Sequence, residues 1–135
     1  MAKSVFTHLP VAVHLHWMRE LARAIRPGGV FALTLEPRRF IDFIRDVPED
    51  SDHAWYNLLK MHQPRVPEFY QDFDADKLIF MPTNVGHEQD YGDAVVPMPF
   101  IETHWQPWFG VVSYLDDPER FWQAVLVVKR TSAAI

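Results

Sequence analysis

Apolar residues near the start of the chain recur at steps of three and four. They are Val11, Leu15, Met18, Leu21, Ala22 and Ile25. This spacing places them on one stripe of an α-helix. Pro10 suits the first helical turn, where a missing N–H costs nothing, and the Pro27-Gly28-Gly29 turn ends the helix. The pattern predicts a helix over residues 11–25.

A mostly apolar run of strand length follows this turn, at residues 29–35. Such a run, bounded by glycine and proline, is typical of a strand buried on both faces, as in a parallel sheet. Residues 4–7 are interpreted as the tail of an earlier strand. The order strand, helix, strand then predicts a right-handed parallel unit. Phe40, Ile41 and Ile44 indicate a further short helix.

Residues 47–99 are less regular, and we interpret them as an insertion over one end of the sheet, on the substrate side. A short helix that carries Trp55 and Leu59 ends at the prolines at positions 64 and 67, and residues 77–82 predict a short strand. The insertion has too little alternating apolar sequence for its own core. With 135 residues, the chain is expected to form a single domain, 1–135.

Two β-rich runs close the chain, at residues 108–115 and 123–129. The polar connection between them is too short for a helical crossover, so they are predicted to be antiparallel neighbours. Residues 99–105 favour a short helix, and residues 131–135 are expected to fray.

The charge, the cysteine content and the length of the apolar runs exclude several classes of function. The formal net charge of −5 gives no overall positive field, so nucleic acid is not an expected partner. The absence of cysteine excludes a disulfide framework, a thiolate metal site and a cysteine nucleophile. The longest apolar runs are far shorter than the roughly 18 residues of a membrane span, and the first residues lack the apolar core of a secretory signal. A cytoplasmic protein without membrane partners is the expectation.

The first 36 residues resemble the second half of class I S-adenosylmethionine-dependent methyltransferases. The resemblance rests on Ser-Val-Phe-Thr-His-Leu-Pro at 4–10, Trp-Met-Arg-Glu-Leu at 17–21 and Arg-Pro-Gly-Gly-Val at 26–30. It implies the end of that family's fourth strand, the following helix and its fifth strand. Tyr91-Gly92, His104-Trp105 and the final hairpin follow in a similar order. The expected fold is therefore α/β: a partial Rossmann-like methyltransferase fold with a short parallel sheet segment, flanking helices and a C-terminal antiparallel hairpin.

The sequence departs from this family at the cofactor site. Such sites need a glycine-rich turn after the first strand and an acidic residue after the second. The five glycines lie at positions 28, 29, 86, 92 and 110, and none forms that turn. The expectation is a truncated methyltransferase: S-adenosylmethionine is the cofactor of the full-length parent, and this chain alone binds none.

A truncated sheet would also expose an edge and an apolar face, which predicts a homo-oligomer formed through that edge. Two alternatives stay open. One is a non-catalytic binding or dimerisation module on a degenerate methyltransferase scaffold. The other is an unrelated α/β protein.

Five residues are candidates for the site of methyl transfer to a small-molecule acceptor. Glu36 and His87 are the candidate catalytic groups, because transfer to oxygen or nitrogen needs a base. His8, Tyr91 and His104 are the candidate substrate-binding residues. Three of them have a structural alternative: a turn histidine for His8, a solvated carboxylate for Glu36, and a histidine satisfied at a helix end for His104.

The sequence does not favour a metal site or an aromatic substrate cage. His14 and His16 are two apart on the predicted helix and point to different sides, so no metal site is expected. The aromatic residues near the final hairpin, including Trp105, are interpreted as packing rather than as a substrate cage.

Overall fold

A computed structural model describes residues 1–83 and 91–135. The helices and strands mix along the chain, so the α/β class is confirmed. The larger sheet has three strands in the order β1-β5-β4, with β1 at Val30–Leu35, β4 at Phe109–Leu115 and β5 at Ala124–Arg130. The smaller sheet pairs β2, Ile79–Pro82, with β3, Gly92–Val95.

The expected parallel sheet is not found among the described residues, because every pairing of named strands is antiparallel. The apolar run of β1 suggested a parallel neighbour, but β1 pairs instead with β5 of the final hairpin. Parallel contact is limited, in the described part, to single bridges joining Ala2 to Leu33 and Glu36 to Val95. The residues after Ala2 leave the sheet, since Phe6–His8 is a 3₁₀ turn.

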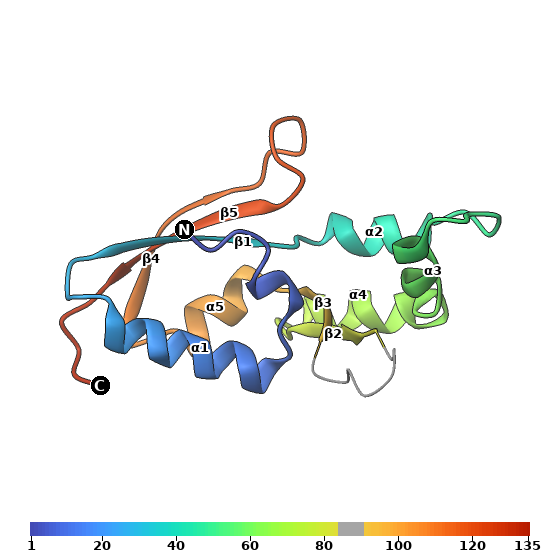
Figure 1. Cartoon of the computed structure of the whole chain (residues 1–135). Coiled ribbons are helices and arrows are strands. Elements are labelled where there is room, and N and C mark those ends of the chain that lie inside the picture. The colour runs from blue at the N-terminus through green and yellow to red at the C-terminus, as the bar shows by residue number, and fades with distance from the viewer. Residues whose placement is uncertain (84–90) are drawn as a thin grey trace.

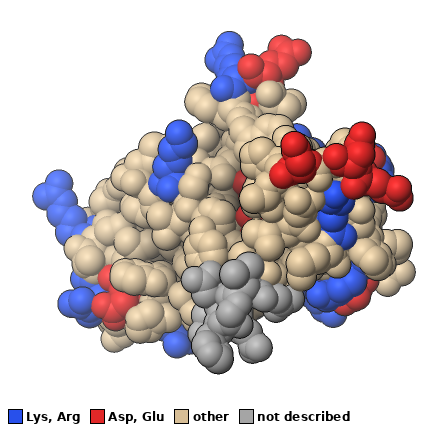
Figure 2. All heavy atoms as spheres, turned by 45° about the vertical axis from the view of Figure 1, so that its right-hand side comes forward, with Lys and Arg blue, Asp and Glu red and all other residues tan. Residues whose placement is uncertain are grey.

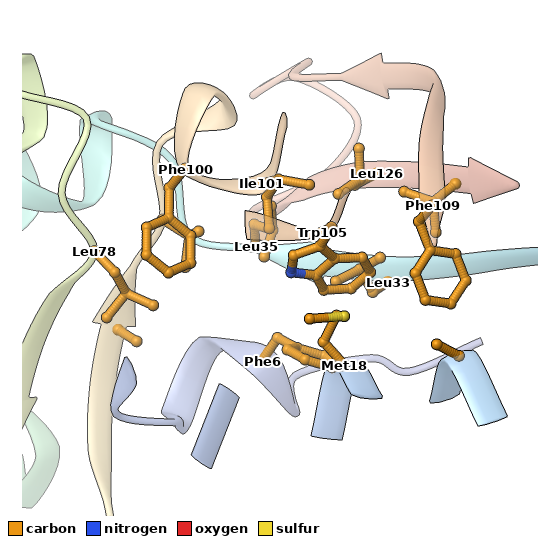
Figure 3. Packing of buried hydrophobic residues seen from close by; sticks show 14 residues of the cluster. Phe6, Met18, Leu33, Leu35, Leu78, Phe100, Ile101, Trp105, Phe109 and Leu126 are labelled. Atoms are coloured by element: carbon orange, nitrogen blue, oxygen red, sulfur yellow. The ribbon is translucent and has the colours of Figure 1, made fainter. Parts of the chain in front are cut away.

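Helices α1, Val11–Ala24, and α5, Met98–His104, lie on one face of the larger sheet (Figure 1). Both predicted helices are confirmed. The buried residues of α1 are His14, Met18 and Ala22, whereas Val11 at its start is exposed. Trp105 lies between α1 and the sheet with Phe6 and Met18 around it (Figure 3). Trp105 is therefore core, as expected.

A second hydrophobic cluster lies beyond the end of β1 and involves the short helices (Figure 1). They are α2, Arg39–Arg45, α3, Ala54–Lys60, and α4, Val66–Asp74. Helix α4 was not predicted, because Pro64 and Pro67 were interpreted as helix ends; instead, proline occupies the first turn of α4, where it is tolerated. Phe69 of α4 packs with Ile41 of α2 and Met81 of β2.

The C-terminal residues are tied down rather than frayed. The buried guanidinium of Arg130 donates to the carbonyls of Ala22, Thr131 and Ala133. The indole of Trp108 donates to the carbonyl of Ala134 at 2.8 Å. Arg130 also places a positive charge at the C-terminal end of α1, where the helix dipole is negative.

Candidate functional site

The two sheets meet at the carboxyl end of β1. Glu36, which follows the last residue of β1, bridges Val95 of β3 in parallel, and its carbonyl accepts a hydrogen bond from the Val96 N–H at 3.2 Å. Glu36 and His8 are two of the five candidate residues, and both lie at this junction, where His8 is close to Asp93 of β3. The side chains around this junction are therefore the candidate site.

Glu36 is 5% exposed, and its carboxylate is held by Gln123, whose amide donates to Glu36 Oε1 at 2.8 Å. Gln123 in turn accepts a hydrogen bond from the Ser4 hydroxyl at 3.1 Å. Ser4 has a φ of 55°, in the left-handed region that few non-glycine residues adopt, and its N–H donates to the Thr34 hydroxyl. A hydrogen-bonded chain thus runs from the N-terminal segment to the carboxylate.

Burial raises the pKa of Glu36 to about 7, because a charged carboxylate is disfavoured away from water. The hydrogen bond from Gln123 opposes this rise, the nearby Asp93 adds to it, and Arg39 opposes it. Glu36 therefore exchanges its proton close to neutral pH. That behaviour suits a general base or acid.

Asp93 of β3 is the second buried carboxyl group, 7% exposed. The Trp55 indole donates to Asp93 Oδ2 at 3.3 Å, and His8 Nδ1 lies 3.6 Å from Asp93 Oδ1. Burial raises the pKa of Asp93, while the Trp55 hydrogen bond and the nearby His8 and His62 lower it. The 3₁₀ turn, α3 and β3 thus each bring one polar side chain to the junction.

His8 and Tyr91 stack on each other, with ring centroids 5.1 Å apart and an angle of 17° between the planes. Nδ1–H of His8 donates to the Gly92 carbonyl at 2.7 Å, which leaves Nε2 as the remaining nitrogen. A side chain at Gly92 would collide with the Met81 carbonyl, so only glycine lets β3 approach β2 here. Through Asp93, which is near both Glu36 and His8, and through the stacking of Tyr91 on His8, the structure brings three of the five predicted residues to one junction.

The other two predicted residues are not part of this arrangement. His87 lies outside the described residues, so nothing here tests its predicted role. His104 ends α5, stacks on Phe100 with ring centroids 4.1 Å apart, and bonds the Phe100 carbonyl through Nδ1 at 2.9 Å. These contacts match the structural alternative for His104, a histidine satisfied at a helix end.

Three residues of the junction were missed in the sequence: Asp93, Gln123 and Trp55. Asp93 is the one acidic residue of the short run Gly-Asp-Ala-Val-Val, which could have signalled a buried carboxylate in a strand. Gln123 and Trp55 carry no comparable signal, because only the fold brings them beside Glu36 and Asp93.

Two hollows flank the Glu36–Gln123 hydrogen bond. One, of about 220 Å³, is lined by Glu36, Arg39, Phe43 and Trp122 among others. The other, of about 420 Å³, includes Gln123 in its lining, and Trp122 again forms part of the wall. Arg39 fixes this wall by donating to the Trp122 carbonyl at 2.6 Å. Figure 2, which brings this end of the molecule forward, shows acidic atoms set back in a recess between two lobes.

The described residues offer no group of three histidine, cysteine or acidic side chains that could hold a metal ion. Within 1–83 and 91–135, the glycines lie before β1, at the start of β3 and inside β4, so none forms a glycine-rich turn after a strand. No helix in the described part is long and apolar enough to cross a membrane.

Comparisons with protein-family models, with curated proteins and with solved structures found no match to this chain.

Proposed function

We propose that this chain forms the acceptor side of a class I S-adenosylmethionine-dependent methyltransferase domain and that Glu36 is its proton acceptor. The observation that carries the proposal is the buried Glu36 carboxylate at the carboxyl end of β1, whose pKa is raised to about 7. An effective general base has a pKa near the operating pH, and Glu36 meets that condition.

The arrangement of elements supports the resemblance seen in the sequence. Helix α1 leads through the turn at Gly28, which has a positive φ of 82°, into β1. The final hairpin of β4 and β5 pairs antiparallel and lies beside β1. Ala2 bridges the other side of β1 in parallel, as the end of a preceding strand would.

The acceptor is a small molecule with a hydroxyl or amine group. In the ionised form, Glu36 would take the proton that this group releases as its oxygen or nitrogen bonds the methyl carbon. The bond from that carbon to the sulfonium sulfur of S-adenosylmethionine would break, and S-adenosylhomocysteine would leave. Gln123 orients the carboxylate, and the stacked rings of His8 and Tyr91 form an amphipathic wall beside Asp93. The hollow that Glu36 lines holds about 220 Å³, below the roughly 300–1,000 Å³ of typical ligand pockets, so it admits only a small acceptor.

The methyl donor is held by residues that this chain does not supply. A loop of the remaining residues cannot replace a preorganised pocket without a large cost in ordering. In this proposal, the chain therefore acts only together with a segment that carries the glycine-rich turn.

The test compares this chain with a longer reading frame. An in-frame glycine-rich segment encoded upstream is the first requirement, and its absence would contradict the proposal. Both chains are then heated with S-adenosylhomocysteine, the product of methyl transfer. The longer chain is expected to gain stability, about 2.7 kcal/mol at a hundredfold excess over Kd, and the 135-residue chain none. Micromolar binding to the short chain, or none to the long one, overturns the proposal.

A non-catalytic binding or dimerisation module is the second candidate. The exposed strand β4 favours it, because six of its seven residues, from Gly110 to Leu115, are exposed in a row. Failure of the upstream requirement, with the junction around Glu36 intact, would favour this candidate.

A further inference from the structure

Strand β4 forms the outer edge of the larger sheet, since it stands at the end of the order β1-β5-β4. Its residues from Gly110 to Leu115 are exposed, and Val112 is exposed to 57%. An edge strand presents unpaired N–H and C=O groups that can pair with another chain. Among the described residues, the opposite edge is better protected, because Ala2 pairs with Ala32 and Thr34 of β1 through two backbone hydrogen bonds.

Proteins commonly protect an edge with charges, proline or an irregularity. The sequence of β4, Phe-Gly-Val-Val-Ser-Tyr-Leu, contains neither a charged residue nor proline. Its one irregularity is a shift of register between Val111 and Ser113. This shift interrupts the ladder at Val112 but leaves a regular segment on either side.

Hollows lie on both faces of the sheet at this edge. The first, of about 360 Å³, is lined by Trp105, Phe109 and Val128 among others. The second, of about 460 Å³, is lined by Val112, Lys129 and Thr131 among others, and Gly110 borders both. Val128 and Lys129 are consecutive in β5 and point to opposite faces. A strand added to β4 would therefore place alternate side chains in the two hollows, the arrangement by which sheet edges recognise a strand.

We propose that β4 is the interface to a second copy of this chain, with the two β4 strands paired antiparallel about a two-fold axis. The pairing would join two three-stranded sheets into one continuous sheet. It stands independently of any methyltransferase activity.

The charges at the two ends of β4 favour antiparallel pairing with the β4 strand of a second copy. Asp116, Asp117 and Glu119 follow the end of β4; Asp116 pairs with Arg39 and Asp117 with Arg120, so this end keeps a net negative charge through Glu119. Lys129 lies beside Gly110 near the start of β4. Gly110 has no side chain to block Lys129, and a Cβ there would meet nothing within 4 Å. Antiparallel pairing brings the acidic end of one β4 alongside the Lys129 end of the other. Parallel pairing would instead place acidic ends together.

The interface is limited to a seven-residue strand and its two flanking hollows. Stable complexes bury roughly 1,200–2,000 Å² in total. We therefore expect a dimer that forms with rising concentration rather than an obligate one.

Sedimentation velocity from about 10 µM to 1 mM tests this proposal. The expected result is a rise in mass from 15.8 kDa toward twice that value. Val112→Lys places a charge at the centre of the edge and is expected to weaken association at least tenfold. Val11→Lys is the matched control, because Val11 is 40% exposed but lies at the start of α1 rather than on the sheet. Circular dichroism and thermal unfolding confirm that both variants fold.

Three results would overturn the proposal. The wild-type chain stays monomeric throughout, Val112→Lys associates as the wild type does, or both variants lose association equally. The last result would show that the copies associate by a route other than pairing at the β4 edge. Loss of association in Val112→Lys alone supports the edge.

Discussion

The helix-covered face of the larger sheet and the junction at the end of β1 both bury an ionisable side chain. Under α1, His14 is fully buried, and burial followed by the nearby His104 lowers its pKa to about 3. At the junction, burial raises the pKa of Glu36 to about 7. Each group is pushed toward its neutral form, but only Glu36 is left titrating near physiological pH.

The difference lies in the neighbours. His14 is enclosed by the rings of Phe6, Phe100 and Trp105, and its Nε2 accepts a hydrogen bond from the Trp105 indole at 3.0 Å. Glu36 instead has an amide donor, a second carboxyl group and two adjoining hollows. Burial among apolar rings therefore keeps His14 neutral at physiological pH. Burial beside polar partners leaves Glu36 able to gain or lose its proton near neutral pH.

The largest expected effect is on the covered face. Trp105→Ala removes the indole that fills the space between α1 and the sheet and leaves His14 without its donor. We expect a loss of about 3–5 kcal/mol in the free energy of unfolding, measured by urea denaturation. Trp122→Ala is the control, since Trp122 is 56% exposed; a similar loss in both variants would contradict the distinction between the two regions.

Glu36→Gln is expected to stabilise the protein at pH 8. The folded pKa of Glu36 is raised from its ordinary value of 4.5 to about 7, so the stability it contributes is present below pH 4.5 and is lost as the pH rises through 7. Removing the charge restores about 3 kcal/mol at pH 8, at about 1.4 kcal/mol for each pH unit between those values. Urea denaturation at pH 8 and pH 4.5 measures this. An equal stability of both proteins at the two pH values would show that Glu36 is not buried as described.

His14 gives a pH dependence of the opposite sign. Its folded pKa is lowered from 6.5 to about 3, so its contribution to stability is present above pH 6.5 and is lost as the pH falls. In the wild type, Glu36 partly cancels this change between pH 4.5 and 6.5. In Glu36→Gln the cancellation is absent, and stability should fall by about 2 kcal/mol from pH 6.5 to pH 5. Adding His14→Gln, which keeps a side-chain acceptor, should flatten the curve; a persistent slope would locate the effect elsewhere.

The smallest effect concerns the hydrogen bond to the carboxylate. Gln123→Ala removes the donor that lowers the pKa of Glu36, so that pKa should rise further, by less than about one unit. Carbon-13 NMR of labelled glutamate follows the titration directly. Ser4→Ala is the control, because Ser4 touches Gln123 and not Glu36; a larger shift in Ser4→Ala than in Gln123→Ala would contradict the proposed role of Gln123.

Much of the local structure could be predicted from the sequence, because it follows from neighbouring residues. The three- and four-residue steps in residues 11–25 predict α1, and the short polar connection at 116–120 predicts that β4 and β5 are antiparallel. Both hold in the structure. The partner of β1 could not be predicted in the same way. The continuous apolar run of β1 is typical of a strand in a parallel sheet, but burial on both faces gives the same run beside the antiparallel β5.

The site was predictable only where the chain order itself places a residue at the end of an element. Glu36 follows a strand and His8 precedes a helix, so both were candidates from position alone. Trp55 reaches the junction from α3 and Asp93 from β3, and Gln123 directly precedes β5. Their proximity depends on long-range packing, which no local pattern encodes.

The guanidinium of Arg130 also determines how the chain tolerates trimming. Its acceptors at Thr131 and Ala133 come from the last five residues, so a protease that removed them would leave a buried cation with two fewer acceptors. Residues 131–135 therefore stabilise the buried Arg130 at the C-terminal end of α1. A form of this protein without them would lose more free energy of unfolding than the apolar area they bury accounts for.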